Sequence, residues 1–137
     1  MTEETITVLY NNCFGGWTIN PIVTDLYNER RKGIIPIKYM PDDYASEVTR
    51  HDPLLVEIYH ELGETFDDDR SISQTNAEPI PAKYKDYYQI EEYEGRETVV
   101  IDMDKYELAV LKEHIRLLLE NTATTDAEKI AAVRQLL

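Results

Sequence analysis

The chain has one cysteine among its 137 residues, no long apolar run, and only 14 basic side chains against 27 acidic ones. A single cysteine, Cys13, excludes an intramolecular disulfide and gives no indication of secretion. No apolar run approaches the roughly 20 residues of a membrane span, and the acidic N-terminus lacks the basic and apolar regions of a signal peptide. We therefore expect a soluble intracellular protein.

The acidic composition excludes one large class of partner. A net charge of −13 is opposite to the basic surface with which DNA- and RNA-binding proteins displace counterions. The one basic run, Arg30-Arg31-Lys32, is best explained as the last turn of a helix, where cations complement the helix dipole. We expect neither nucleic acid nor an anionic membrane as a partner.

The apolar content is sufficient for a packed core despite this charge. Hydrophobic residues make up 42% of the chain, and its length fits a single domain over 1–137. Alternating β-branched residues predict a strand over 5–10, and Asn20 before a proline predicts a helix that ends at Gly33. Because the segment 34–40 is interrupted and closed by prolines, we expect an edge strand or an extended linker there. The inner face of the first helix is predicted to carry Ile22, Val23, Leu26 and Tyr27.

The motif Arg50-His51-Asp52-Pro53 fixes the start of a second helix. Asp52 is suited to cap the helix, and a proline suits its first position, where a missing N–H costs nothing. An apolar stripe follows and stops at Gly63. The next stretch is rich in acidic and small polar residues, so we expect 64–85 to be a mobile acidic excursion.

The second half of the chain predicts a hairpin. Strand formers over 87–93 and 97–102 flank Glu94-Gly95, a pair suited to a tight turn. The whole order of elements predicts an α+β fold, in which a small, mainly antiparallel sheet with a hairpin is packed by about four helices on one side.

Two capping-box signatures predict the closing helices. One pairs Asp104 with Glu107 and the other pairs Thr125 with Glu128. The second of these helices ends on two leucines, and an exposed apolar end is costly, so we expect it to pack on the body or to form a homo-oligomer with another copy. The inward row expected on the first is Leu108, Leu111, Ile115, Leu118 and Leu119.

Cys13, His51 and Asp52 are the candidate catalytic residues. A thiol that follows a buried strand can act as a nucleophile, with backbone N–H groups of the glycine-rich loop to receive an oxyanion. His51 would be its base, and Asp52 would orient the imidazole. The simpler interpretation, which we favour, is that Cys13 is a small buried hydrophobe beside a tight turn.

Metal binding is only weakly indicated. Glu57 and His60 form a single Glu-x-x-His, whereas a di-iron bundle needs two such motifs. The run 67–69 consists of three aspartates but lacks the glycine and distal glutamate of an EF-hand loop. We expect solvated side chains at both places, and neither a metal nor a cofactor.

The hairpin tip is the second candidate site. Tyrosine offers a large, semi-rigid contact area with a polar tip, so this surface, with Arg96 and its acidic neighbours, can dock a partner protein. The alternative is that the tyrosines cover the core and Arg96 pairs with a carboxylate such as Asp52. If the segment Arg50-His51-Asp52 meets Arg96 in space, these residues form a charged pocket of mixed sign. The tyrosines near the tip are Tyr84, Tyr87, Tyr88 and Tyr93.

Three motifs together resemble a set of uncharacterised small proteins of large double-stranded DNA viruses, including giant viruses of amoebae, and of phages. The motifs are Asn11-Asn12-Cys13-Phe14-Gly15-Gly16, Arg50-His51-Asp52-Pro53 and Tyr93-Glu94-Gly95-Arg96-Glu97. The resemblance implies a protein that is made in the cytoplasm of an infected host cell, and packaging in the virion is compatible with it. Its expected partner is a host or viral protein. The resemblance implies no activity.

Our leading hypothesis is a non-enzymatic interaction module that uses the tyrosine-rich hairpin. The competing hypothesis is a small enzyme or ligand-binding protein, with a site formed by the Cys13 loop, Arg50-His51-Asp52 and Arg96. The first follows from the weak catalytic signals and the acidic surface. The second requires these segments to meet in space.

Overall fold

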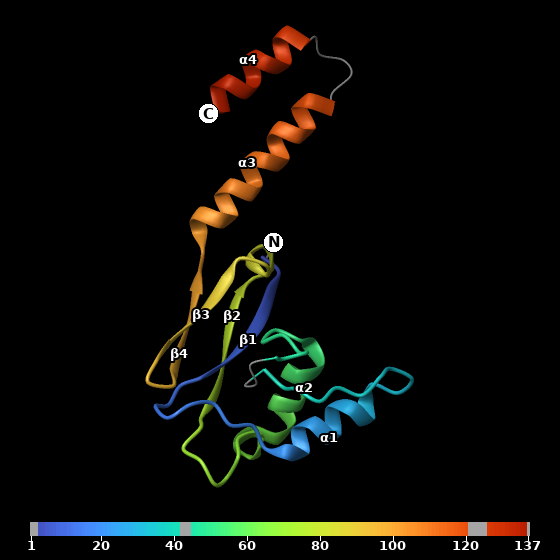
Figure 1. The fold of residues 1–137 in the computed structure, drawn as a ribbon, viewed down its shortest axis with the longest axis vertical. Helices are drawn as coiled ribbons and strands as arrows, with labels where there is room; N and C mark the ends of the chain where they lie inside the picture. The colour runs from blue at the N-terminus through green and yellow to red at the C-terminus, as the bar shows by residue number, and fades with distance from the viewer. Residues whose placement is uncertain (1–2, 42–44, 121–125, 137) are drawn as a thin grey trace. The chain divides into compact units, whose positions relative to one another are not determined.

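The computed structural model describes residues 3–41, 45–120 and 126–136. The chain divides into two compact units, 1–101 and 102–137, which are described separately (Figure 1). The described strands lie in the first unit together with two α-helices, and two further helices form the second unit, so the predicted α+β class is confirmed. Instead of one sheet, the structure has two two-stranded antiparallel sheets.

The first sheet pairs the beginning of the chain with a distant segment. β1 (Thr5–Asn11) runs antiparallel to β2 (Thr75–Pro81), in a register that joins Thr5 to Pro81 and Asn11 to Thr75. The predicted first strand is therefore confirmed, and Val8 and Leu9 are fully buried in it. β2 was not predicted, because its prolines and polar residues conceal a strand that a two-stranded sheet tolerates at its edge.

The predicted acidic excursion over 64–85 needs correction, since much of it has defined structure. It contains the end of a short 3₁₀ helix, η1 (Gly63–Phe66), then β2, then η2 (Ala82–Tyr84). Phe66 is fully buried. Asp67 accepts hydrogen bonds from the Thr75 backbone N–H at 2.9 Å and the Thr75 hydroxyl at 2.6 Å. The buried ring of Phe66 and the hydrogen bonds of Asp67 therefore fix a segment whose composition is typical of a solvated loop.

The two helices of the first unit begin as predicted. The Asn20 side chain caps α1 (Pro21–Arg30), and Asp52 caps α2 (Pro53–Leu62) by accepting two backbone N–H groups. α2 ends at Gly63 as expected, but α1 ends at Arg30, three residues before Gly33, so that predicted end is wrong. The Arg31 N–H already closes α1 on carbonyls of its last turn.

The core of the first unit lies between β1, α1 and α2, and Figure 1 shows the two helices on the same side of β1 and β2. The segment 34–40 is an extended linker rather than a strand. Asn28 holds it through both backbone groups of Ile37, which is buried. Val23 and Tyr27 of the predicted inner face are buried, whereas Ile22 is 43% exposed, because it lies at the solvent side of the first turn. The buried cluster comprises Leu9, Trp17, Ile19, Val23, Tyr27, Ile37, Met40, Val48, Leu55, Ile58 and Phe66.

The second sheet is the predicted hairpin. β3 (Tyr88–Tyr93) pairs with β4 (Arg96–Ile101) across a two-residue turn. Glu94 has φ 51° and Gly95 has φ 92°, the pair of positive values that matches the twist of a hairpin. β4 also lies beside β1, which brings the hairpin onto the first sheet.

The second unit is a pair of helices, α3 (Met103–Glu120) and α4 (Asp126–Leu136), that pack on each other. Asp102 caps α3 by accepting the Lys105 N–H at 3.0 Å, so the predicted cap at Asp104 is wrong by two residues. The predicted cap at Thr125 lies outside the described residues.

The predicted inward row of α3 is only partly covered. Leu111, Ile115 and Leu118 are half-buried, while Leu108 and Leu119 are each 51% exposed, so their predicted inward position is corrected. The reason is that one short helix, α4, cannot cover the whole apolar surface of an 18-residue helix. Among the helices that the structure describes, none combines the length and apolar character that a membrane span requires.

Candidate functional site

Arg50 lies at the centre of the contacts between β1 and β4. Its guanidinium binds both carboxylate oxygens of Glu97, at 2.6 and 2.9 Å. The side chains of Arg50 and Glu97 are only 16% and 8% exposed. The guanidinium also stacks on the ring of Trp17, 4.1 Å from its centroid. A bidentate, largely buried and stacked arginine is used here to hold the fold together.

Asn11, the last residue of β1, links the segments around this ion pair. It is fully buried, and its backbone N–H donates to Glu97 at 2.8 Å. Its side-chain amide donates to the carbonyl oxygens of Cys13 and Gly95 and accepts from the Gln74 N–H. Every hydrogen-bonding group of this side chain except its second lone pair is thereby used. The role of Asn11 in linking these segments was not predicted, since an asparagine after a strand is also typical of an ordinary turn.

The hairpin turn packs directly on the glycine pair. The Gly15 N–H donates to the carbonyl of Glu94 at 2.8 Å. A Cβ atom added to Gly95 would lie 2.0 Å from the backbone nitrogen of Gly16 and 2.6 Å from that of Gly15. Glycines at these positions allow a backbone-to-backbone approach that no side chain permits. The Cys13 loop and the hairpin tip therefore meet, as the competing hypothesis requires.

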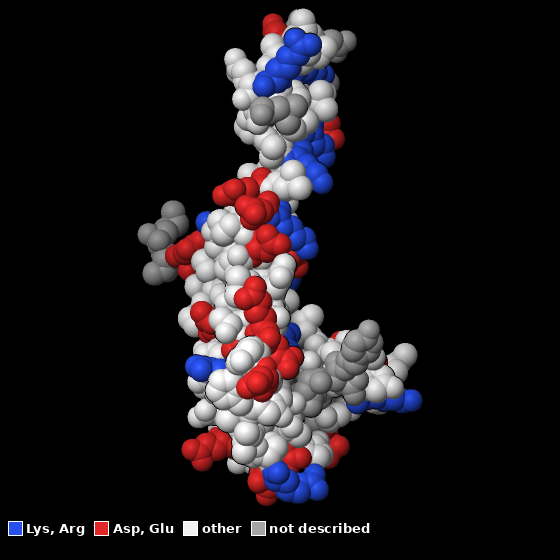
Figure 2. Space-filling view, turned by 60° about the vertical axis from the view of Figure 1, so that its left-hand side comes forward, with Lys and Arg blue, Asp and Glu red and all other residues white. Residues whose placement is uncertain are grey.

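Aromatic and acidic side chains surround this junction on the outside. Phe14 and Tyr93 are 46% and 71% exposed, and their rings meet edge to face with centroids 6.4 Å apart. Arg96 lies over the Phe14 ring at 5.7 Å and donates to the Asn12 side chain at 3.3 Å. We call the exposed patch around these side chains the hairpin-tip surface, a hollow of about 330 Å³ lined by Phe14, Glu91, Glu92, Tyr93, Arg96 and Thr98. Figure 2 shows carboxylate side chains gathered over the face that includes β3 and β4.

The other tyrosines of the hairpin are less accessible. Tyr84, Tyr87 and Tyr88 are partly buried. Burial raises the pKa of Tyr88 to about 12. Its hydroxyl lies 2.7 Å from Nδ1 of His51, and the two rings are edge to face. Of the predicted binding residues, Tyr93 and Arg96 are therefore exposed, whereas Arg50, His51 and Tyr88 take part in internal contacts.

Asp52 is also used by the fold. Its Oδ1 accepts the N–H groups of Leu54 and Leu55, and its Oδ2 accepts the hydroxyl of Tyr27 at 2.6 Å. Burial and this hydrogen bond raise the pKa of Tyr27 to about 12. Asp52 thus joins the start of α2 to α1, and it does not pair with Arg96.

The predicted chain of nucleophile, base and orienter is not assembled in this structure. Within the described parts of the chain the Cys13 thiol has no hydrogen-bond partner, and its carbonyl is bound by Asn11. His51 binds Tyr88, and Asp52 binds Tyr27. The cysteine loop is brought to the hairpin tip by backbone contacts, and the arrangement offers contact area rather than an activated thiol.

His51 provides a pH-dependent test of these contacts. Its pKa is lowered below 6.5, first by burial and then by the nearby Lys85. The unfolded state therefore binds more protons once the pH falls below about 6.5. The stabilising contribution of neutral His51 is fully present above that pH and is lost as the pH drops toward the lower, folded-state pKa.

We expect this loss of stability in urea unfolding at pH 7, 6 and 5, and we expect His51→Gln to reduce it. His114→Gln, which replaces an exposed histidine of α3, is the control. Parallel pH profiles for the wild type and His51→Gln would contradict the assignment.

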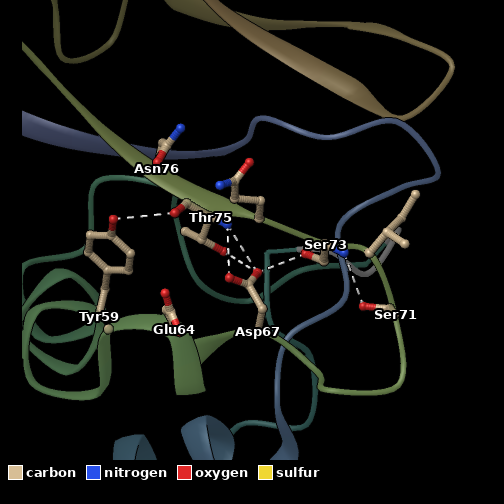
Figure 3. A pocket seen from close by; sticks show the side chains of 10 residues that line it. Tyr59, Glu64, Asp67, Ser71, Ser73, Thr75 and Asn76 are labelled. Carbon is tan, nitrogen blue, oxygen red and sulfur yellow. Dashed lines mark hydrogen bonds between the residues drawn. The ribbon is translucent and has the colours of Figure 1, made fainter.

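A second hollow, of about 570 Å³, lies beside the start of β2 (Figure 3). Asp67 is bound there by the hydroxyl groups of Ser73 and Thr75. The Tyr59 hydroxyl donates to the Thr75 carbonyl at 3.3 Å, and the Trp17 indole N–H donates to the Thr75 hydroxyl. The hydrogen bonds of Asp67 with Ser73 and Thr75 stabilise the loop that leads into β2.

The side chains weighed as metal ligands make other contacts in the structure. Glu57 lies 3.9 Å from Arg30, and the ring of His60 is tilted against that of a neighbouring tyrosine, with centroids 5.3 Å apart. Asp68 pairs with Arg70, while Asp67 stabilises the loop before β2. Among the described residues no three histidine, cysteine, aspartate or glutamate side chains are grouped as metal ligands.

Comparisons of this chain with protein-family models, with curated proteins and with solved structures find no match. Of the sites described above, the hairpin-tip surface is the one where large aromatic side chains are both exposed and supported by a rigid backbone junction.

Proposed function

We propose that this protein is a non-enzymatic interaction module whose hairpin-tip surface binds a basic segment of a partner protein. The observation that supports the proposal most is the exposure of Tyr93, 71% of whose surface is accessible at the end of a hairpin fixed by the Gly95 contact. Tyrosine and arginine in such positions are the residues that dominate binding energy in protein interfaces.

A rigid backbone favours this role. The turn lies on Gly15 and Gly16, and the second residue pair after it includes Glu97, which is fixed by Arg50. Tyr93 and Phe14 each have only two side-chain torsions, and they already contact one another. Binding would therefore order few additional degrees of freedom, which preserves affinity.

The charge of the surface indicates the kind of partner. Glu91, Glu92 and Glu94 are exposed around Tyr93, and Arg96 is the nearby cation. In a chain of net charge −13, this local excess of carboxylates attracts lysine- and arginine-rich segments and accelerates their association. Because the sequence resembles small viral proteins, we propose that the partner is a host or viral protein.

Selection from a phage-displayed library of random peptides on the immobilised full chain tests this function. We expect the enriched peptides to carry net positive charge with at least one aromatic or large apolar residue. A synthetic copy of the best peptide should bind at least about tenfold more weakly to Tyr93→Ser, because loss of one interface anchor is typically worth 1.4 kcal/mol or more. Glu92→Lys should weaken it as well, mainly through a slower association rate.

Ile35→Ser is the matched control, because Ile35 is 86% exposed and lies outside the hairpin-tip surface. It should leave peptide binding unchanged. Enrichment of acidic peptides, no enrichment at all, or equal binding to Tyr93→Ser would overturn the proposal.

A further inference from the structure

We infer that the basic segment of the partner binds as an additional β-strand along the free edge of β3. The inference rests on the proposed function and goes further, because it names the conformation of the partner and the backbone atoms that bind it. β4 has β3 on one side and lies beside β1. Among the described strands, β3 therefore has a neighbour on one side only.

The register of the hairpin shows which backbone groups of β3 face this edge. Because a two-residue turn closes on a hydrogen-bonded pair, here Tyr93 with Arg96, the pairs that follow alternate between non-hydrogen-bonded and hydrogen-bonded. Ile90 and Glu92 stand in non-hydrogen-bonded pairs, so their N–H and C=O groups point away from β4. Within the described parts of the chain these four groups have no hydrogen-bond partner. They have the spacing of the groups to which an added strand binds.

The edge of the other sheet is protected, whereas the edge of β3 is not. In β2 the outward-facing positions include Pro79 and Pro81, which have no N–H to donate. Thr75, which also faces outward, already binds Asp67 through its N–H and Tyr59 through its carbonyl. β3 contains neither proline nor lysine, the residues with which proteins commonly prevent pairing at an edge.

The charge of β3 favours a basic segment over a second copy of this chain. Glu91 and Glu92 lie in β3, and Glu94 follows in the turn. Two copies paired edge to edge would bring these carboxylates together, in chains that each carry a net charge of −13. Like charges on neighbouring strands are destabilising, whereas opposite charges stabilise the pair. Lysine or arginine side chains on the added strand are therefore the complement of this edge.

The two faces of β3 predict the order of side chains in the partner. Tyr88 binds His51, so the face that carries Tyr88 is turned inward. Glu91 and Tyr93 lie on the opposite face and line the hairpin-tip surface. Side chains two positions apart share one face of a strand. We therefore expect the selected peptides to carry a basic residue and an aromatic or large apolar residue two positions apart.

Amide hydrogen exchange of the full chain, followed by NMR with and without the best selected peptide, tests the added strand. At saturating peptide, the outward amides of Ile90 and Glu92 should exchange at least about tenfold more slowly, because each gains a backbone acceptor or is covered by one. The amide of Ala77 is the matched control, since it faces the proline-protected edge of β2, and its exchange should not change. Unchanged exchange at Ile90 and Glu92 in the bound state would overturn the inference.

Proline at position 92 tests the same edge by affinity. Glu92→Pro removes an N–H that points away from β4, so the hairpin should persist with a similar urea midpoint. Glu92→Ala is the matched comparison, because it lacks the same carboxylate but keeps the N–H. The selected peptide should bind at least about tenfold more weakly to Glu92→Pro than to Glu92→Ala. Equal binding to these two variants would contradict the added strand.

N-methylation of the peptide gives a readout that leaves the protein unchanged. In an added strand, alternate N–H groups face β3. Methylation should therefore weaken binding at every second position and have little effect between them. An equal effect at all positions, with Tyr93→Ser still weakening binding, would overturn the added strand and leave the proposed function standing. If no peptide is enriched, both the proposed function and this inference are overturned.

Discussion

Replacing Gly95 with alanine should lower the free energy of unfolding of the first unit by about 3 to 5 kcal/mol. The added methyl group would lie 2.0 Å from the nitrogen of Gly16, and the atoms it meets are backbone atoms that cannot move aside as a side chain can. The position also has φ 92°, which is costly for any L-residue with a Cβ. Crowding and backbone strain therefore add.

Gly33→Ala separates the two causes. Gly33 also has a positive φ, 82°, but nothing lies within 4 Å of its added Cβ. It should cost only the backbone term, about 1 to 2 kcal/mol. Urea unfolding followed by tryptophan fluorescence reports directly on the junction, because Trp17 is the only tryptophan. An equal decrease in the free energy of unfolding for the two variants would show that close packing of the hairpin turn on Gly15 and Gly16 does not add to the backbone strain.

The second large effect is expected at Glu97. Glu97→Leu removes the only acidic partner described for Arg50 and also the acceptor of the Asn11 N–H. A largely buried guanidinium without its carboxylate should destabilise the fold by about 3 to 5 kcal/mol. Arg50→Lys should also be costly, because lysine provides neither the bidentate contact nor the flat stacking on Trp17.

A double-mutant cycle distinguishes the net contribution of the Arg50–Glu97 pair to the free energy of unfolding from the destabilisation caused by leaving one charge without its partner. Arg50→Met with Glu97→Leu should be more stable than Glu97→Leu alone, since no buried charge remains without a partner. The exposed pair of Arg30 and Glu61 is the control. Its N–O distance of 2.5 Å is even shorter, yet Glu61→Leu should change stability little, because water already solvates both groups. A double variant no more stable than Glu97→Leu would contradict this account.

Much of the fold could be predicted from local signals. The first strand, the caps of α1 and α2, and the Glu94-Gly95 turn each depend on neighbouring residues, and the structure confirms them. β2 could not be predicted, because its pairing with β1 depends on residues some seventy positions away. Its own composition, with two prolines, argues against a strand.

Several residues of the candidate site could be singled out from the sequence, but the residues that they contact could not. Arg50 stood out because helix capping did not explain it, and its partner is Glu97, the residue next to the Arg96 that drew attention. The role of Asn11 could not be predicted, because a single asparagine after a strand already has a simple local explanation. Charge pairs and buried hubs are set by tertiary contacts across 47 and 86 residues, which no local pattern encodes.

The separation in sequence between β1 and its partners also matters while the chain is being synthesised. Synthesis proceeds from the N-terminus at about 5 to 20 residues per second, and Asn11 contacts Glu97, which lies 86 residues later in the sequence. β1 is therefore synthesised on the order of ten seconds before its last contact. During that time the uncharged, β-prone run over residues 5–10 has unpaired edges, the kind of segment that aggregates. Glu3 and Glu4 directly precede it, and charges in that position oppose association between nascent chains.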